Sequence, residues 1–174
     1  SGDHYLSNGR IRANEINIDG DMNTTASAVE ADTIGITGIG SLKTQQTAFN
    51  AESYEISGSV ELIGSDSTQT SIQEASSSHT PTAPDNIFYV GKSFNVRGTI
   101  SGGNLYIHDK PGTKANMHLN GTVDVTKTRV AMNSLTTGSR SVMKGEAISI
   151  ELNRTFQHAG QIEGEIVNIN TILS

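Results

Sequence analysis

The chain has 174 residues, no cysteine, and a net charge of −6 that is scattered along its length. These features exclude a disulfide scaffold and a thiolate metal site, and they provide no basic patch for nucleic acid. Hydrophobic residues make up 34% and aromatic residues 5% of the chain, which suits a thin aliphatic core better than a thick globular one. No apolar run approaches the roughly 20 residues of a membrane helix, so we expect no membrane insertion.

The first elements are three copies of one ten-residue template. Residues 11–20, 29–38 and 49–58 read IRANEINIDG, VEADTIGITG and FNAESYEISG. Each copy has the pattern apolar-x-Ala-x-x-apolar-x-apolar-x-Gly, and the copies begin 18 and then 20 residues apart. Repeats of this length are typical of stacked units rather than of an ordinary globule.

One copy predicts two short strands joined by a corner. The first apolar residue and the Ala alternate inward, the next two residues shift the phase, and the second apolar pair points inward again. Alanine suits a place beside a corner where space is narrow, and we expect the final Gly to supply a positive φ for a further bend. Such a turn cannot bury its apolar side alone, so the next copy must stack on it at about 4.8 Å.

The pattern continues through Val60 and Leu62 and then stops. Residues 65–87 contain two prolines and a Ser/Thr-rich tract, and we expect a loop or insertion there. The template resumes at 89–98, YVGKSFNVRG, where Tyr89 lies two periods of 20 after Phe49 and Gly91 takes the Ala place. The insertion is therefore expected to interrupt one continuing coil within a single segment, residues 1–174.

Apolar and polar residues alternate as in β-strands through the rest of the chain, and no stretch has an amphipathic helical pattern. Residues 100–109 match the template, residues 110–112 (KPG) predict a turn, and Asn120-Gly121 predicts a corner or a hairpin. We therefore expect an all-β fold, a right-handed parallel β-helix (β-solenoid) of about seven or eight coils. An antiparallel sandwich is the alternative, but it does not explain Ala and Gly at fixed places in three copies.

Catalytic, cofactor-binding and metal-binding residues are not expected. A glycosidase needs two carboxylates across a groove, and the chain offers three pairs whose ordinary role is that of solvated surface groups: Asp19/Asp21, Asp109/Asp124 and Glu163/Glu165. The five histidines lack metal-ligand spacing: His4, His79, His108, His118 and His158.

Three residues are candidates for contact with a partner. Tyr106 and Phe88 alternate against inward neighbours, so we expect both to point outward and to form a small binding patch. His108 alternates outward beside Asp109, either as a surface group or as a general base.

The template resembles the haemagglutinin repeat of filamentous-haemagglutinin-type exoproteins, which are bacterial adhesins and contact-dependent toxin carriers exported by two-partner secretion. The residues that carry the resemblance are Ile11, Ala13, Ile16, Ile18 and Gly20; Val29, Ala31, Ile34, Ile36 and Gly38; and Phe49, Ala51, Tyr54, Ile56 and Gly58. The insertion and the irregular spacing after residue 109 depart from the family pattern.

The resemblance implies a noncatalytic structural or adhesive stalk, secreted or at the bacterial cell surface, without a cofactor. Its partners would be a host-cell or neighbouring bacterial receptor or glycan, and flanking repeats of the parent protein. Ser1-Gly2 looks like a cloning remnant, so we expect an excised piece of a longer repeat protein. Two other functions stay open: a carbohydrate-active or tailspike-like β-helix that binds polysaccharide, and a self-polymerising cytoskeletal β-solenoid.

Overall fold

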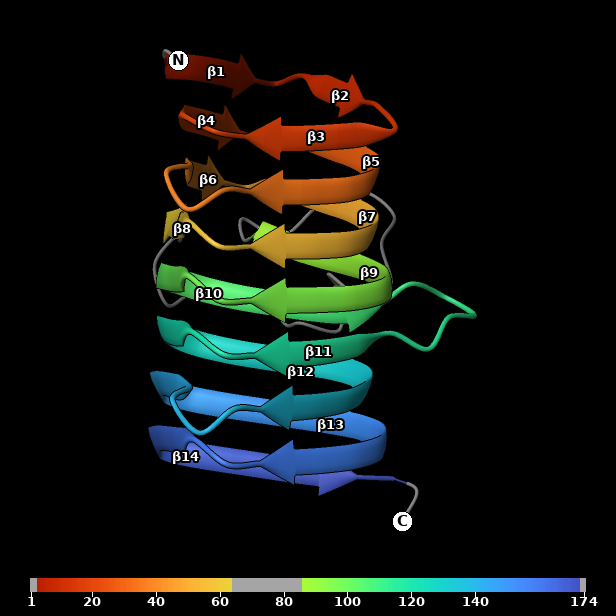
Figure 1. The fold of residues 1–174 in the computed structure, drawn as a ribbon, viewed down its shortest axis with the longest axis vertical. Helices are drawn as coiled ribbons and strands as arrows, with labels where there is room; N and C mark the ends of the chain where they lie inside the picture. Colours follow the sequence, from red (N-terminus) through yellow and green to blue (C-terminus); the bar gives the residue numbers. More distant parts are fainter. Residues whose placement is uncertain (1–2, 64–85, 173–174) are drawn as a thin grey trace.

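The computed structural model describes residues 3–63 and 86–172, whose regular structure is entirely β-strand (Figure 1). The strands are β1 (Asp3–Ser7), β2 (Arg10–Arg12), β3 (Glu15–Ile18), β4 (Asp21–Thr25), β5 (Ala28–Ile36), β6 (Ser41–Gln45), β7 (Ala48–Ile56), β8 (Ser59–Ile63), β9 (Asn86–Val96), β10 (Thr99–Asp109), β11 (Asn116–Leu119), β12 (Thr122–Thr137), β13 (Val142–His158) and β14 (Gln161–Thr171). All pair in parallel within one 14-stranded sheet. The predicted parallel β-solenoid is confirmed, with about seven turns.

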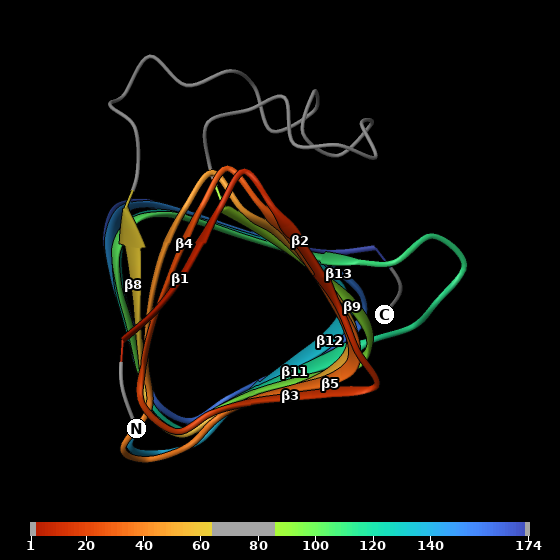
Figure 2. The same ribbon diagram turned by 90° about the horizontal axis from the view of Figure 1, so that it is seen from above.

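The sheet winds into a coil with three faces, which gives the triangular outline in Figure 2. Face A holds β1, β4, β6, β8 and the first parts of β10, β12, β13 and β14. Face B holds β2, the first parts of β5, β7 and β9, and then the second part of β10 and the middle or end of β12, β13 and β14. Face C holds β3, the second parts of β5, β7 and β9, then β11 and the ends of β12 and β13.

The coil continues directly across the predicted insertion. On face A, β8 pairs with β10, and on faces B and C, β7 pairs with β9. Turns are numbered here from each passage through face A, so β8 opens the fourth turn and β9 completes it. Most of the predicted loop, residues 65–85, lies outside the described residues, and its predicted end at residue 87 is too late because β9 begins at Asn86.

The register of β9 differs from the prediction by one residue in its first half. Phe49 pairs with Phe88 rather than with Tyr89, whereas Tyr54 pairs with Phe94 as expected. A bulge between Ala51 and Ser53 accounts for the difference, because two residues of β9 lie opposite one residue of β7 there. Val90 therefore takes the place that was predicted for Gly91.

The core is a column of side chains from the inward positions of the three faces. Its largest buried side chains lie at the third and fourth turns, where the rings of Phe49 and Phe88 stack with their centroids 4.7 Å apart. The rings of Tyr54 and Phe94 pack beside them at 5.0 Å. Ala51 is fully buried, as the template predicts, whereas Ala31 is half-buried and Ala13 is exposed at the same template position, so the predicted inward alanine holds fully only in the third copy. Residues of both sequence segments thus build one core across the interruption.

Glycines at the corner between faces C and A serve close stacking rather than a positive φ. A Cβ on Gly58 would lie 2.2 Å from the carbonyl oxygen of Gly40, and one on Gly98 would lie 1.9 Å from that of Gly58. Neither glycine has a positive φ, so the expected reason was wrong. The non-glycine residues with a positive φ in the described part of the chain lie at the corner between faces A and B in the first three turns, at Asn8, Ala26 and Gln46.

Candidate functional site

The connection between β10 and β11, residues 110–115, projects from the corner between faces B and C (Figure 1). We call it the corner loop. The amide of Thr113 donates to the carbonyl of Lys110 at 3.0 Å, and Gly112 has a φ of +81°. With Pro111 before it, this is a type II turn, which requires a residue such as glycine at its third position. The turn predicted from KPG is confirmed.

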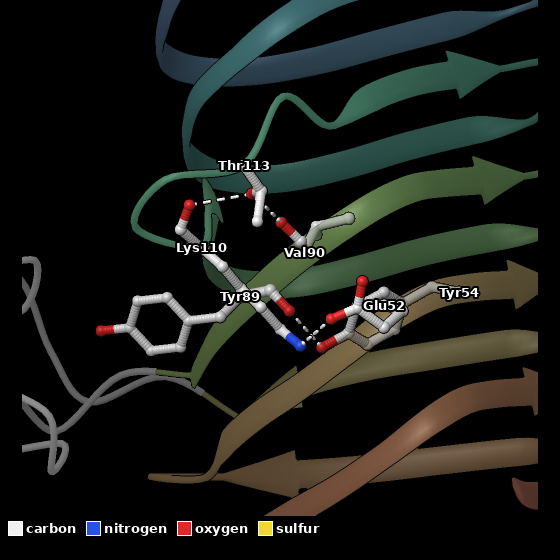
Figure 3. A network of polar contacts seen from close by, with 6 residues as sticks. All are labelled: Glu52, Tyr54, Tyr89, Val90, Lys110 and Thr113. Atoms are coloured by element: carbon white, nitrogen blue, oxygen red, sulfur yellow. Dashed lines mark hydrogen bonds and ion pairs between the residues drawn. The ribbon is translucent and has the colours of Figure 1, made fainter. Parts of the chain in front are cut away.

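A set of polar contacts holds the corner loop against the coil (Figure 3). The Nζ of Lys110 donates to Oε1 of Glu52 at 2.7 Å, and the Thr113 hydroxyl donates to the carbonyl of Lys110 at 2.8 Å. The backbone amide of Lys110 donates to the carbonyl of Val90 at 2.9 Å. The ion pair joins the third turn to the fifth, and we call it the Glu52–Lys110 clip.

The clip passes over the fourth turn at Gly91. A Cβ on Gly91 would lie 2.4 Å from Oε2 of Glu52, so the carboxylate occupies the space that a side chain would fill. The hydrogen bond from Lys110 keeps the pKa of Glu52 below its usual value, against the opposing effect of burial. The bulge in β9 therefore provides both the glycine and the room for the clip.

A groove of about 390 Å³ lies on the coil beside the clip. It is lined by Arg12, Ala13, Asn14, Glu30, Ala31, Asp32, Asn50 and Lys110. Most of these residues come from equivalent positions of the first two template copies. The second template position gives an outer row of Arg12, Glu30 and Asn50 along face B, and the fourth position gives a corner row of Asn14, Asp32 and Glu52.

Two of the four charged side chains in the groove already have partners. Glu30 accepts a hydrogen bond of 2.5 Å from Arg10, which holds the pKa of that carboxyl below its usual value. Lys110 is held by Glu52. The side chains of Arg12 and Asp32 make no hydrogen bond or ion pair with other described residues, so one guanidinium and one carboxylate are available to a ligand.

The predicted patch of Phe88 and Tyr106 is not an exposed surface. Phe88 points into the core against Phe49 and is 2% exposed, so the prediction that it points outward was wrong. Its neighbour Tyr89 takes the outward position instead, because of the bulge. Tyr106 does alternate outward from the core, but it is also 2% exposed and packs with Ile87. The prediction that Tyr106 is solvent-exposed was therefore also wrong.

His108 and Asp109 are adjacent in sequence but face different surroundings. Burial and the nearby charge of Arg129 lower the pKa of His108 to about 4. Burial raises the pKa of Asp109 to about 6, although its carboxylate accepts a hydrogen bond of 3.0 Å from the amide of Ala115. Neither group contributes to the shift of the other, so they do not form the interacting pair that a histidine base oriented by a carboxylate would need. His108 is half-buried beside Tyr89, with ring centroids 6.4 Å apart.

The carboxylate pairs considered from the sequence lie on exposed or separate surfaces. Asp19 and Asp21 are both exposed. Asp109 is the last residue of β10 and lies on face B, whereas Asp124 lies on face A, so the structure does not bring these two carboxylates together. Glu163 and Glu165 are exposed, and Glu163 forms an ion pair of 3.5 Å with Lys144.

Residues 3–63 and 86–172 contain no group of three or more histidine, aspartate or glutamate side chains placed to share a metal ion. His79 lies outside these ranges. The same residues contain no helix that could cross a membrane.

The groove was not predicted from the sequence, although a signal for it was present. Aligning the three copies puts their second and fourth positions, which face outward, into two rows of polar residues. The alignment could not reveal Lys110, which lies outside the three copies. Its ammonium group reaches Glu52 of the third turn because the residue between them, Gly91 at the bulge, has no side chain to block the contact.

No family model, curated protein or solved structure matches this chain.

Proposed function

We propose that this chain is a noncatalytic structural and adhesive segment of a secreted or surface-exposed bacterial exoprotein. In this proposal the coil serves as a stiff spacer, and the corner loop and the rows beside it face a partner. The resemblance of the template to haemagglutinin repeats supports the location and the adhesive part.

The observation that carries the proposal is the continuous parallel pairing of the strands. Pairing runs from β1 to β14 along face A, and each turn is hydrogen-bonded to the next. A load along the axis is therefore distributed over many backbone hydrogen bonds and a continuous apolar column. The last strand exposes Ile166, Val167 and Ile169 at 60%, 39% and 42%, surfaces that flanking repeats of a parent protein would cover.

A binding assay and an activity assay together test this proposal. Labelled chain is added to epithelial cells and to bacterial cells, and bound label is measured by flow cytometry. The same preparation is incubated with a panel of polysaccharides, and new reducing ends are measured. We expect saturable cell binding and no new reducing ends.

Two results would count against the proposal. Release of reducing ends would favour the carbohydrate-active alternative. Filaments seen by electron microscopy at neutral pH, together with absence of cell binding, would favour the self-polymerising alternative.

A further inference from the structure

The groove beside the corner loop has a balanced charge. Its lining contains two cationic side chains, Arg12 and Lys110, and two anionic ones, Glu30 and Asp32. A site for phosphate, sulfate or a carboxylate needs an excess of positive charge, and a site for a divalent cation needs several convergent oxygen ligands. The groove therefore favours neither an anion nor a metal ion.

The lining also disfavours an apolar ligand. The apolar side chains in it are those of Ala13 and Ala31, which are too small to enclose a hydrocarbon group. The remaining side chains are amides, carboxylates, a guanidinium and an ammonium group. A ligand without hydrogen-bonding groups would leave them unpaired as water is displaced.

The two rows present donors and acceptors side by side at a regular spacing. Arg12, Glu30 and Asn50 follow one another along the axis because their strands are parallel and in register. Their spacing is therefore about 4.8 Å, the distance between neighbouring strands. Asn14 and Asp32 form the second row, which the backbone fixes because the amide of Asp32 donates to the carbonyl of Asn14 at 3.0 Å.

Hydroxyl groups fit this arrangement best, because each one both donates and accepts a hydrogen bond. A linear chain of sugar rings carries neighbouring hydroxyls on every ring, and one ring spans a length similar to the rise of one turn.

We propose that this groove binds a neutral oligosaccharide lying along the axis of the coil, with Arg12 and Asp32 as its main polar contacts. This inference rests on the proposed adhesive function and names the chemistry of the partner. Cation and anion selectivity are both excluded by the balance of charge, so binding is expected to change little with salt.

The test uses the whole chain and defined probes. Cellotetraose, maltotetraose and chitotetraose represent neutral oligosaccharides, and a galacturonic acid tetramer and a heparin tetrasaccharide represent acidic ones. Binding is measured by calorimetry at low and at physiological salt. We expect one or more neutral probes to bind, with a dissociation constant that changes less than threefold with salt.

Variants assign the binding to the groove. The double substitution Arg12→Ala with Asp32→Ala removes the two available charged groups and should weaken binding of the neutral probe at least tenfold. The matched control, Arg140→Ala with Asp124→Ala, removes one cation and one carboxylate at exposed positions elsewhere and should change it less than twofold. Circular dichroism melts of both variants check that the fold is kept.

Three outcomes would overturn the inference: no neutral probe binds, only the acidic probes bind and do so in a salt-dependent way, or both double variants bind like the unmodified chain. Cell binding separates this inference from the proposed function. If the unmodified chain adheres to cells but binds no neutral probe, the inference is refuted and the adhesive proposal stands. If the chain binds a neutral probe and releases reducing ends from polysaccharides, the inference stands and the noncatalytic proposal is refuted.

Discussion

Replacing Gly98 by alanine should damage the fold far more than replacing Gly38, although both glycines end a copy of the template. A Cβ on Gly98 would lie 1.9 Å from the carbonyl oxygen of Gly58 and 2.7 Å from the carbonyl carbon of Ser57. An ordinary contact is 3.4 Å or more, so the third and fourth turns would have to separate by about 1.5 Å at this corner. A Cβ on Gly38 would meet no atom within 4 Å.

The expected cost of Gly98→Ala follows from two effects. Overpacking typically costs about 1–3 kcal/mol. The amides of Gly98 and Thr99 also donate to the carbonyls of Ile56 and Gly58, each at 3.0 Å, and separating the turns weakens both hydrogen bonds at about 1 kcal/mol each. We expect a total loss of about 3–5 kcal/mol. For Gly38→Ala we expect a small gain of about 0.5 kcal/mol, because alanine restricts the unfolded chain.

Urea unfolding followed by circular dichroism measures both changes. The midpoint and the slope are compared for the unmodified chain, Gly98→Ala and Gly38→Ala, since stacked repeats need not unfold in one step. Equal effects of the two substitutions, or a change of less than about 0.5 kcal/mol for Gly98→Ala, would show that the corner tolerates a Cβ and that the stacking argument is wrong.

Phe88→Ala should lower the free energy of unfolding by about 3–5 kcal/mol, because Phe88 is buried. The control Tyr5→Ala removes a ring that is 74% exposed and should cost less than about 0.5 kcal/mol. Similar costs of the two substitutions in urea unfolding would refute the inward placement of Phe88. Gly91→Ala should displace the Glu52 carboxylate of the clip and increase amide hydrogen exchange in the corner loop. The free energy of unfolding should fall by about 1 kcal/mol or less, because the ion pair is partly exposed. Unchanged hydrogen exchange would contradict the role of the clip. Asp109 has its pKa raised from 3.8 to about 6, so its contribution to stability is complete below pH 3.8 and is lost as the pH rises to 6. His108 has its pKa lowered from 6.5 to about 4, so its contribution is present above pH 6.5 and is lost as the pH falls to 4. The two slopes oppose each other, and melting temperatures between pH 4 and 6 should fall on acidification in Asp109→Asn and rise on acidification in His108→Gln; parallel profiles in the two variants would contradict both shifts.

The repeat in the sequence was sufficient to predict the fold because every copy alternates apolar residues on one side. Ile34 and Ile36, for example, are each 2% exposed, as their template positions require. Parallel stacking followed from the need of each copy to bury that side against the next. The same reasoning explained Ala51, which is fully buried beside a corner, but not Ala13, which is exposed at the same template position.

The details that the sequence did not supply depend on contacts between turns. One extra residue in β9 reverses the orientation of Phe88 and Tyr89, and no residue type in YVGKSFNVRG marks a bulge unambiguously. Aromatic residues are compatible with either face of a strand, so alternation counted from a wrong starting residue placed Phe88 outside. The role of Gly91 was likewise invisible, because Glu52 reaches it from another turn.

The Glu52–Lys110 clip has a consequence for how this part of the chain can vary. The clip joins the third turn to the fifth, and the fourth turn between them contains the connection from β8 to β9. Together with the stacked rings of Phe49 and Phe88, it fixes the alignment of the flanking turns from outside and from inside. Both contacts are made by residues outside that connection, so an exchange of its sequence leaves their side chains in place. The fourth turn is a natural position for grafting a foreign peptide, and the alignment of the neighbouring turns after such an exchange measures how well the two bracing contacts hold.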